Sequence, residues 1–147
     1  LQQYPFVINY VNTVSAFHHN GESLKRLLYA AERNIPSIYL PGSTRGTLAP
    51  ITSAGAMALH NAGQLAGLVL SQLKREGSPL ILCGRNGGYL DMRTMVSLYT
   101  APDNGPYGWD LARHYRIPTF TAACTDAKIF DAQAAGETAL TLFEKTP

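Results

Sequence analysis

Two opposite charges, Asp91 and Arg93, stand two residues apart in a polar, glycine-rich segment that spans residues 84–94. In an extended segment, residues two apart point the same way, so these side chains could share a ligand or pair with each other. A solvated ion pair of this kind would contribute little stability. The spacing leaves both interpretations open, a functional pair and a surface ion pair.

A second group of charges, Asp126, Lys128 and Asp131, follows an apolar run near the end of the sequence. Aspartate is a preferred residue at helix N-termini, so Asp126 and Asp131 could cap the helix that the next residues predict. Lys128 lies next to the end of a predicted strand and could instead act as a functional cation. The spacing favours the capping interpretation for the aspartates.

The segment 41–47, Pro-Gly-Ser-Thr-Arg-Gly-Thr, lies between a predicted strand and a predicted helix. Its glycines and hydroxyls, next to a helix N-terminus, could hold an anion. It lacks the Gly-Lys-Ser/Thr ending of a P-loop, and the sequence contains no Gly-x-Gly-x-x-Gly fingerprint of dinucleotide binding. The alternative is that Gly42 and Gly46 only form tight turns.

The four histidines do not form a recognisable metal or hydrolase motif. His18 and His19 are adjacent, and no Cys or His partner recurs at a spacing typical of zinc sites. His60 and His114 lie within predicted helices, where we expect structural or solvated roles. No Gly-x-Ser-x-Gly elbow is present. We therefore expect no metal site.

Aromatic residues gather in and beside the long segment after residue 84, at Tyr89, Tyr99, Tyr107 and Trp109. Aromatic faces can enclose a quaternary amine, and each contributes about 0.5–2 kcal/mol depending on desolvation. Ordinary packing is the alternative role of these side chains.

Four apolar runs, each of which follows a proline, predict the strands that must position these residues. They cover residues 6–11, 37–40, 80–83 and 119–123. The first is rich in β-branched and aromatic residues and reads as a buried strand. Cys83 and Cys124 lie at the ends of two runs, where we expect buried free thiols rather than a disulfide framework.

Helical periodicity predicts a helix after each strand. The first is capped by Asn20 and ends at Arg33 and Asn34, and the second begins near Thr52 or Ser53. The third covers about residues 107–115, and the fourth begins near Asp131. Apolar residues at helical spacing predict the buried faces of three of them: Leu24, Leu27, Leu28 and Ala31; Ala58, Ala62, Leu65, Val69 and Leu73; Ala132, Ala135, Ala139 and Leu142.

These elements predict an α/β fold of four consecutive βα units with a parallel sheet, in a single segment that spans residues 1–147. Continuous apolar strands joined by helices indicate a sheet that is covered on both sides or closed into a barrel. The strand-to-helix connections are long and the helix-to-strand connections are short. Ligands of such folds bind at the carboxyl ends of the strands, where all the candidate residues lie.

The composition excludes several other classes of protein. Of the 147 residues, 46% are hydrophobic and 15% charged, and the formal net charge of +2 is scattered rather than clustered. We therefore expect no nucleic-acid surface. No apolar run reaches the roughly 18 residues of a membrane span, and the first residues do not resemble a signal peptide. A cytoplasmic protein that binds neither membranes nor nucleic acids is expected.

In these segments the sequence resembles the trimethylamine methyltransferase family, the corrinoid-dependent methylamine and glycine betaine methyltransferases, and in particular its branch without pyrrolysine. The matching stretches follow the family's order along almost the whole chain. They are Asn9-Tyr10-Val11-Asn12 with Ser15, the helix 23–33, residues 49–56, residues 61–72, Asp91-Met92-Arg93-Thr94, Thr125-Asp126-Ala127-Lys128 and residues 131–134.

The resemblance implies a (βα)8 TIM barrel of several hundred residues. This chain would cover about half of that barrel, and it would be inactive alone. It also implies transfer of a methyl group from a methylated, quaternary amine to the cobalt of a corrinoid protein. Cobalamin would then be carried by that partner, and the chain would bind no cofactor directly. Because the outer strands of a half barrel are unpaired, a homo-oligomer is a further expectation.

The resemblance also suggests which residues form the site. The charged residues at the active mouth would be catalytic, namely Asp91, Arg93, Asp126 and Lys128. The residues expected to bind the substrate are Asn12, Arg45, Tyr89 and Gln133. A quaternary ammonium leaves as a neutral amine without protonation, so positioning and charge placement should dominate over acid–base catalysis.

The sequence departs from the family pattern at four positions. Arg45 places a positive charge near a cationic substrate, which suits the site only if the arginine binds a carboxylate such as that of betaine. Phe130 replaces a usual proline, and Ala135 and Met95 replace usual glycines. The alternative function, from the residues alone, is a small flavodoxin-like module that binds a phosphate-bearing ligand or a protein partner through segment 41–47.

Overall fold

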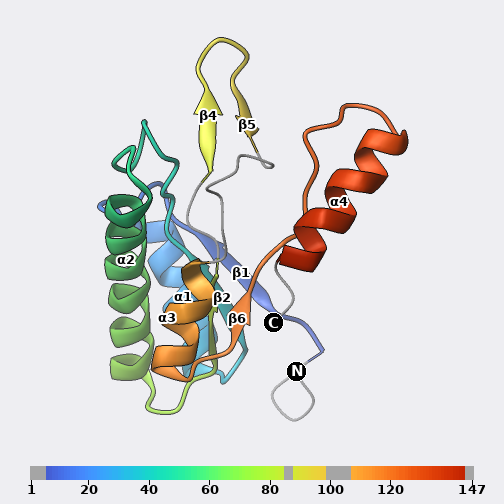
Figure 1. The fold of residues 1–147 in the computed structure, drawn as a ribbon. Coiled ribbons are helices and arrows are strands. Elements are labelled where there is room, and N and C mark those ends of the chain that lie inside the picture. The colour runs from blue at the N-terminus through green and yellow to red at the C-terminus, as the bar shows by residue number, and fades with distance from the viewer. Residues whose placement is uncertain (1–5, 85–87, 99–106, 145–147) are drawn as a thin grey trace.

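A computed structural model of the chain describes residues 6–84, 88–98 and 107–144, without the side chains of residues 107–109, 112 and 144. Six strands and four helices lie in these ranges (Figure 1). The strands are β1 (Asn9–Asn12), β2 (Ser37–Leu40), β3 (Leu80–Cys83), β4 (Tyr89–Asp91), β5 (Val96–Leu98) and β6 (Thr119–Phe120). The helices are α1 (Gly21–Glu32), α2 (Ser53–Lys74), α3 (Tyr107–Tyr115) and α4 (Ala132–Glu144).

The main sheet is parallel and its strands follow one another in chain order, β1-β2-β3-β6. Helix α1 contacts β1 and β2, α2 contacts β2 and β3, and α3 contacts β6. Since α2 also contacts both α1 and α3, the three helices cover the same face of the sheet, while α4 lies apart from them (Figure 1). The predicted α/β fold of four βα units is confirmed, and it is compatible with part of a barrel.

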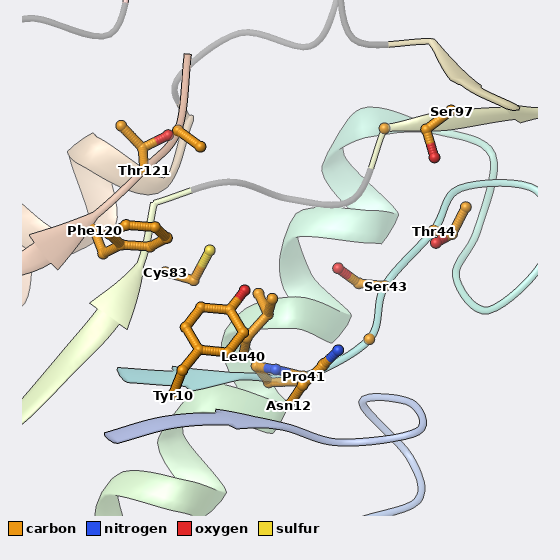
Figure 2. Close-up of a pocket in the computed structure, with 13 residues that line it drawn as sticks. Tyr10, Asn12, Leu40, Pro41, Ser43, Thr44, Cys83, Ser97, Phe120 and Thr121 are labelled. Carbon is orange, nitrogen blue, oxygen red and sulfur yellow. The ribbon is translucent and has the colours of Figure 1, made fainter. Parts of the chain in front are cut away.

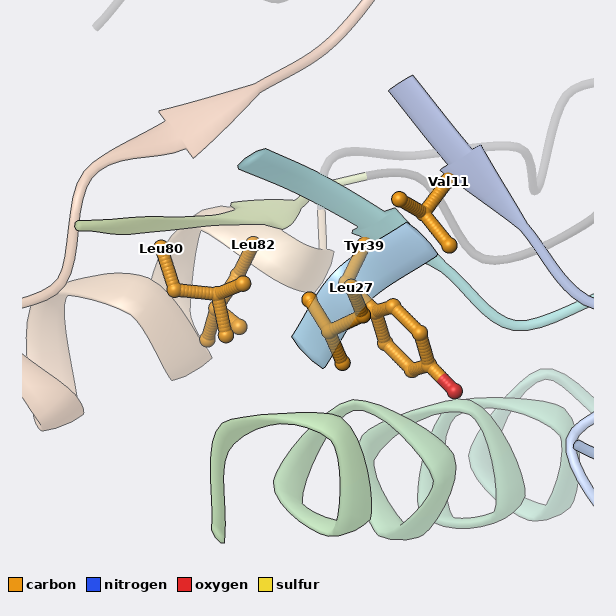
Figure 3. Close-up of a cluster of buried hydrophobic side chains, with 5 residues drawn as sticks. All are labelled: Val11, Leu27, Tyr39, Leu80 and Leu82. Atoms are coloured by element: carbon orange, nitrogen blue, oxygen red, sulfur yellow. The ribbon is translucent and has the colours of Figure 1, made fainter. Parts of the chain in front are cut away.

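The hydrophobic core lies between this sheet and its three helices. Strand residues that point toward the helices meet Leu27 of α1 in one buried cluster (Figure 3), and these strand residues are Val11, Tyr39, Leu80 and Leu82. The Tyr39 hydroxyl reaches Nδ1 of His19 at 2.5 Å. Burial raises the pKa of Tyr39 to about 12, so this phenol stays neutral and serves as a hydrogen-bonding group.

The face of α2 that packs against the core is opposite to the face that the spacing of its apolar residues predicts. Ala58 and Ala62 of the predicted stripe are exposed, Leu65 is half-buried, and the exposed fractions of Val69 and Leu73 are 54% and 79%. The buried residues of α2 are instead small or polar, namely Ala56, His60, Gly63, Gln64, Gly67 and Ser71.

Close approach of α2 to the sheet explains this reversal. A Cβ atom at Gly63 would come within 2.8 Å of Pro41, and one at Gly67 would overlap the Tyr39 ring. Only a face of glycines fits against a bulky strand side chain at this distance. The predicted stripe was therefore wrong because the size of the facing side chains, rather than hydrophobicity, selects the buried face.

The first and last strands of the sheet are shorter than predicted. Strand β1 begins at Asn9 rather than at residue 6, and the exposed fractions of Phe6, Val7 and Ile8 are 83%, 48% and 51%. Strand β6 contains only Thr119 and Phe120 of the predicted 119–123. Both are the outermost strands, and pairing on one side only leaves their ends without the neighbours that extend a strand.

A hairpin interrupts the segment that was predicted as a loop after β3. Strands β4 and β5 pair antiparallel, and their connection closes with a hydrogen bond from the Met95 amide to the Asp91 carbonyl at 2.7 Å. Met95 has a φ of 56°, in the left-handed region that favours glycine. The hairpin projects beyond the carboxyl edge of the main sheet (Figure 1).

The predicted helix ends are largely confirmed. Asn20 occupies the N-cap position of α1 and Asn34 adopts a φ of 56° after its last residue, although the Asn20 side chain makes no capping bond. Asp131 caps α4, since its Oδ1 accepts the Ala134 amide at 2.9 Å. The predicted apolar face of α4 is exposed, because within the described residues no strand or helix covers it: Ala132, Ala135, Ala139 and Leu142.

Among the residues that the structure describes, no helix is both long enough and apolar enough to cross a membrane.

The contact between α2 and Tyr39 generates a test of the packing. We expect Gly67→Ala to lower the free energy of unfolding by about 1–3 kcal/mol, because the new methyl group would overpack against a fully buried ring. Gly136→Ala in α4 is the matched control, since its Cβ would meet nothing within 4 Å. There we expect no loss, or a gain of up to about 1 kcal/mol from helix propensity. Urea unfolding of both variants measures the difference, and equal stabilities would contradict the packing argument.

Candidate active site

A cavity of about 260 Å³ opens at the carboxyl ends of the main-sheet strands, on the face that α1, α2 and α3 leave uncovered (Figure 2). Its floor comes from the strands and its rim from the segments that follow β2, β3 and β6. Thirteen described residues line it: Tyr10, Asn12, Leu40, Pro41, Gly42, Ser43, Thr44, Cys83, Gly88, Ser97, Phe120, Thr121 and Ala122. Drug-sized ligands occupy about 300–1,000 Å³, so this cavity suits a smaller molecule.

Two aromatic rings, one from each outer strand, form a wall of the cavity. Tyr10 of β1 and Phe120 of β6 meet edge to face, with ring centroids 6.1 Å apart and planes at 81°. The sequence analysis missed both as site residues. The available signal was the alternation of side chains along each strand, because strand residues of this parity line the face away from the helices.

Of the residues predicted to bind the substrate, Asn12 lines this cavity. Its carbonyl accepts the Ser23 hydroxyl at 2.6 Å, which fixes the end of β1 against α1. The amide group of Asn12 belongs to an exposed residue at the cavity and can both donate and accept hydrogen bonds.

A buried polar pair, Ser43 and His60, lies beside the cavity and was not predicted as functional. Ser43 Oγ and His60 Nδ1 are 2.9 Å apart, and His60 Nε2 lies 3.3 Å from the Cys83 carbonyl oxygen. Gln64, one turn further along α2, donates to the same carbonyl at 2.7 Å. The exposed fractions of Ser43 and His60 are 4% and 2%, so this network is held in the protein interior.

Burial lowers the pKa of His60, and the carbonyl groups of Cys83 and Pro41 oppose that effect without reversing it. The imidazole is therefore neutral at physiological pH. The sequence analysis expected a structural or solvated histidine, and the structural role is confirmed. What the sequence did not show is that its hydrogen-bond partner lines the cavity.

Arg45 and Tyr89, both predicted to bind the substrate, contact each other. The Arg45 guanidinium lies 3.8 Å from the centroid of the Tyr89 ring, and its Nη1 donates to Ser53 Oγ at 2.7 Å. The Arg45 amide donates to the Gly88 carbonyl at 3.1 Å. Arg45 is 1% exposed, so these contacts fasten the β4–β5 hairpin to the segment between β2 and α2.

Asp91 and Arg93 pair with each other in the hairpin turn. Arg93 Nε lies 3.5 Å from Asp91 Oδ1, and the Arg93 amide donates to the same oxygen at 2.9 Å. The hydrogen bond from the Arg93 amide is the main cause that lowers the pKa of Asp91. The Arg93 side chain is 91% exposed, so this is an ion pair at the solvent-exposed rim. Its catalytic role stays a prediction.

Glu137 of α4 organises the segment that holds Asp126 and Lys128. Its Oε2 accepts the Thr125 hydroxyl at 2.7 Å and the Asp126 amide at 2.8 Å, while Oε1 accepts Gln133 Nε2 at 2.8 Å. These bonds, the Thr125 hydroxyl first, lower the pKa of Glu137. Asp126 is thus not the cap of α4, since Asp131 holds that place, and Lys128 and Gln133 are exposed.

Three backbone donors of the segment 41–47, the amides of residues 45, 46 and 47, bond to carbonyl groups of the protein, which weakens the interpretation of the segment as an anion cradle. The Thr44 carbonyl accepts the amides of residues 47, 48 and 49, and the Gly46 amide donates to the Ala49 carbonyl. Gly46 has a φ of 80°, and a Cβ at Gly42 would lie 2.6 Å from the Val14 carbonyl oxygen. The glycines therefore serve the turn and the close approach of two segments.

Three further predictions concerned the aromatic residues after position 84, the two cysteines and a metal site. Tyr99 and the side chains of Tyr107 and Trp109 lie outside the described residues. Cys83 is buried at the cavity, as expected, whereas Cys124 is half-buried, and neither forms a disulfide. No group of three His, Cys, Asp or Glu side chains in the described ranges could hold a metal ion.

Comparison with known proteins gives a consistent family. A family model described as trimethylamine methyltransferase (MTTB) matches residues 1–146. A trimethylamine methyltransferase MttB of Desulfitobacterium hafniense (strain DSM 10664 / DCB-2) is 35% identical over 80% of this chain and 24% of its own length. A glycine betaine methyltransferase of Desulfitobacterium hafniense (strain Y51) is 29% identical over 97% of this chain and 30% of its own length.

A proline betaine:corrinoid methyltransferase of Eubacterium limosum is also similar, at 29% identity over 94% of this chain. The chain spans between 24% and 30% of the length of these three relatives.

The lowered pKa of His60 predicts how stability depends on pH. The unfolded chain gains a proton as pH falls through the ordinary value of 6.5, whereas the folded protein resists it until a lower pH. The free energy of unfolding should therefore fall below pH 6.5, with a slope of up to about 1.4 kcal/mol per pH unit from this residue. Above pH 6.5 His60 should contribute no slope.

The measurement is urea unfolding between about pH 5 and pH 8 of the protein and of His60→Gln, which cannot titrate there. The difference between the two curves isolates His60 from the other histidines. A difference that is flat with pH would contradict a neutral, desolvated imidazole.

Proposed function

The chain belongs to the trimethylamine methyltransferase family, and from this premise we propose that it forms part of a methyltransferase that acts on a methylated, quaternary amine. The methyl group would pass to the cobalt of a corrinoid protein, as the name of the proline betaine relative suggests. The observation that carries this proposal is the small cavity at the carboxyl ends of the strands, with aromatic walls from Tyr10 and Phe120 and hydroxyl groups at its rim.

The lining of the cavity suits a methylated amine that carries a charge but no N–H donor. Such a cation has no N–H group to donate, and aromatic faces attract it through the negative face of the ring. Among the lining residues that the structure describes, none is Asp, Glu, Lys or Arg. An amide from Asn12 and the hydroxyls of Thr44 and Thr121 are available to a carboxylate on the same substrate.

The half-barrel interpretation of residues 1–147 is supported by the sheet. In a barrel, strands follow in chain order and all helices lie outside, as α1, α2 and α3 do here. A flavodoxin-like module instead reverses its strand order and carries helices on both faces. The described sheet has no such reversal, so the alternative function as a complete flavodoxin-like module loses its structural basis.

The outer strands support the same interpretation. Within the described residues, neither β1 nor β6 has a second neighbour, and the apolar side chains of Phe6, Val7 and Ile8 are exposed just before β1. Further βα units of a barrel would pair with both strands and cover these side chains. We therefore propose that the chain is about half of a (βα)8 barrel, with the cavity at its active mouth.

In this mechanism the residues of the chain bind and orient the substrate. The corrinoid of the partner protein would supply the metal to which the methyl group passes. The aromatic wall of Tyr10 and Phe120 would hold the ammonium and exclude water, and the departing amine is neutral, so no proton has to be delivered to it.

The predicted catalytic residues stay part of the proposal. Asp91 and Arg93 lie on the hairpin that projects from the carboxyl edge, and Asp126 and Lys128 lie in the segment after β6 (Figure 1). Both positions are on the side where a corrinoid protein would have to approach. Arg45 holds the hairpin, so we propose an anchoring rather than a substrate-binding role for it. We propose a cytoplasmic location, since Cys83 and Cys124 form no disulfide.

The proposed function predicts methyl transfer from quaternary amines by the full-length protein together with a reduced corrinoid protein. Glycine betaine, proline betaine and choline are suitable substrates, and demethylated product is measured by mass spectrometry. The control omits the corrinoid protein. Absence of product from every quaternary amine, with folding confirmed by circular dichroism, would rule the function out.

The aromatic wall predicts a specific loss. We expect Tyr10→Ala to lower kcat/KM by about 2- to 30-fold, because one cation-binding face is removed, while Tyr10→Phe retains most activity. Tyr29→Ala is the matched control, since Tyr29 is an exposed tyrosine of α1 that stacks on Arg33 away from the cavity. Equal effects of Tyr10→Ala and Tyr29→Ala on kcat/KM would contradict this placement of the substrate.

A further inference from the structure

The Cys83 carbonyl fixes which nitrogen of His60 carries a proton. Two side chains of α2 approach this oxygen, His60 Nε2 at 3.3 Å and Gln64 Nε2 at 2.7 Å. A carbonyl oxygen can only accept, so we assign the ring proton to Nε2, the nitrogen that faces Cys83. Both side chains are buried and lie one helical turn apart, which makes this an arrangement built into the fold.

The tautomer of His60 then fixes the direction of its bond to Ser43. A neutral imidazole carries one proton, so Nδ1 is an acceptor, and burial keeps the ring neutral by lowering its pKa. Ser43 Oγ lies 2.9 Å from Nδ1, and with this tautomer the serine is the donor of that bond. Whatever else the Ser43 oxygen contacts, it can only accept from that group.

Ser43 lines the cavity, so this restriction determines the polarity that a ligand meets there (Figure 2). A serine whose hydroxyl group can rotate can donate to a carboxylate or accept from a donor. Ser43 can only present lone pairs, which attract positive charge and repel an anion. No Asp or Glu among the described lining residues competes with this effect.

We propose that the Ser43–His60 pair determines substrate specificity. The Ser43 oxygen would present its lone pairs, and not its hydroxyl proton, to the positively charged N-methyl end of the substrate. Ser43 touches the ligand, and His60 is a positioning residue that acts through it. The carboxylate of a betaine would then lie away from Ser43, where the Asn12 amide can donate. The inference rests on the proposed function and deepens it, since it assigns the end of the cavity that receives the cation.

The test compares two ligands of the same shape that differ in charge. Glycine betaine and 3,3-dimethylbutyrate share their carbon framework, but the second has a neutral carbon in place of the quaternary nitrogen. Isothermal titration calorimetry of the full-length protein gives the ratio of their two dissociation constants. We expect the protein to prefer glycine betaine, and Ser43→Ala to reduce that preference by about three- to tenfold.

A second variant tests the role of His60. His60→Gln keeps a donor for the Cys83 carbonyl but has no acceptor at the position of Nδ1, so the Ser43 proton is released and the preference should fall by a similar factor. Ser43→Thr keeps the hydroxyl and should retain the preference. Thr47→Ala, which removes an exposed hydroxyl bonded only to the Thr44 carbonyl among its described contacts, is the control and should leave the ratio unchanged.

The outcomes separate this inference from the proposed function. If the protein binds neither ligand, this inference fails, whereas the proposed function fails only if no quaternary amine is demethylated. If it binds glycine betaine and 3,3-dimethylbutyrate equally well, or if Ser43→Ala keeps the preference of the unaltered protein, only the role of the Ser43–His60 pair is overturned. A reduced preference in Ser43→Ala and His60→Gln but not in Ser43→Thr supports the pair.

Discussion

The hydrogen bonds from α2 to the carbonyl group of Cys83 are the interaction on which the rest of the structure depends. His60 and Gln64 both reach this oxygen at the carboxyl end of β3, and they do so from a helix that lies close to the sheet. That distance requires glycine at positions 63 and 67, opposite Pro41 and Tyr39. An unpaired carbonyl group at a buried strand end would cost about 1–3 kcal/mol, and two donors remove that cost. The helix therefore buries its polar face and leaves much of its apolar face exposed.

This one constraint also shapes the candidate site. The bond to Cys83 orients His60, and His60 in turn orients Ser43 at the wall of the cavity. The segment that carries Ser43 continues into Arg45, which is buried against Ser53 and Tyr89 and so fastens the β4–β5 hairpin beside the same cavity. A rigid support of this kind keeps side chains at a fixed distance from a ligand, which is what a reaction governed by positioning requires.

Much of the fold was predictable because local signals agreed with one another. Strands β2 and β3 and helix α3 have the predicted bounds, and Asn34 and Asp131 end and begin helices as their chemistry suggests. The predictions that were wrong concern features that depend on distant neighbours. The exposed face of α2 follows from the bulk of Tyr39, the short β1 follows from a missing neighbour, and the hairpin after β3 depends on the distant Arg45 for its anchorage.

The sequence by itself determined the order of the βα units, the family, and the side of the sheet on which the polar residues gather, because these depend on periodicity and on residues that are neighbours along the chain. Only the tertiary structure decided which of those residues meet. Asn12 lines the cavity, whereas the Arg45 guanidinium packs on the Tyr89 ring and the Gln133 side chain donates a hydrogen bond to Glu137. The aromatic wall of Tyr10 and Phe120 and the Ser43–His60 pair join residues 110 and 17 positions apart, and contacts over such separations are set by packing of the sheet and helices.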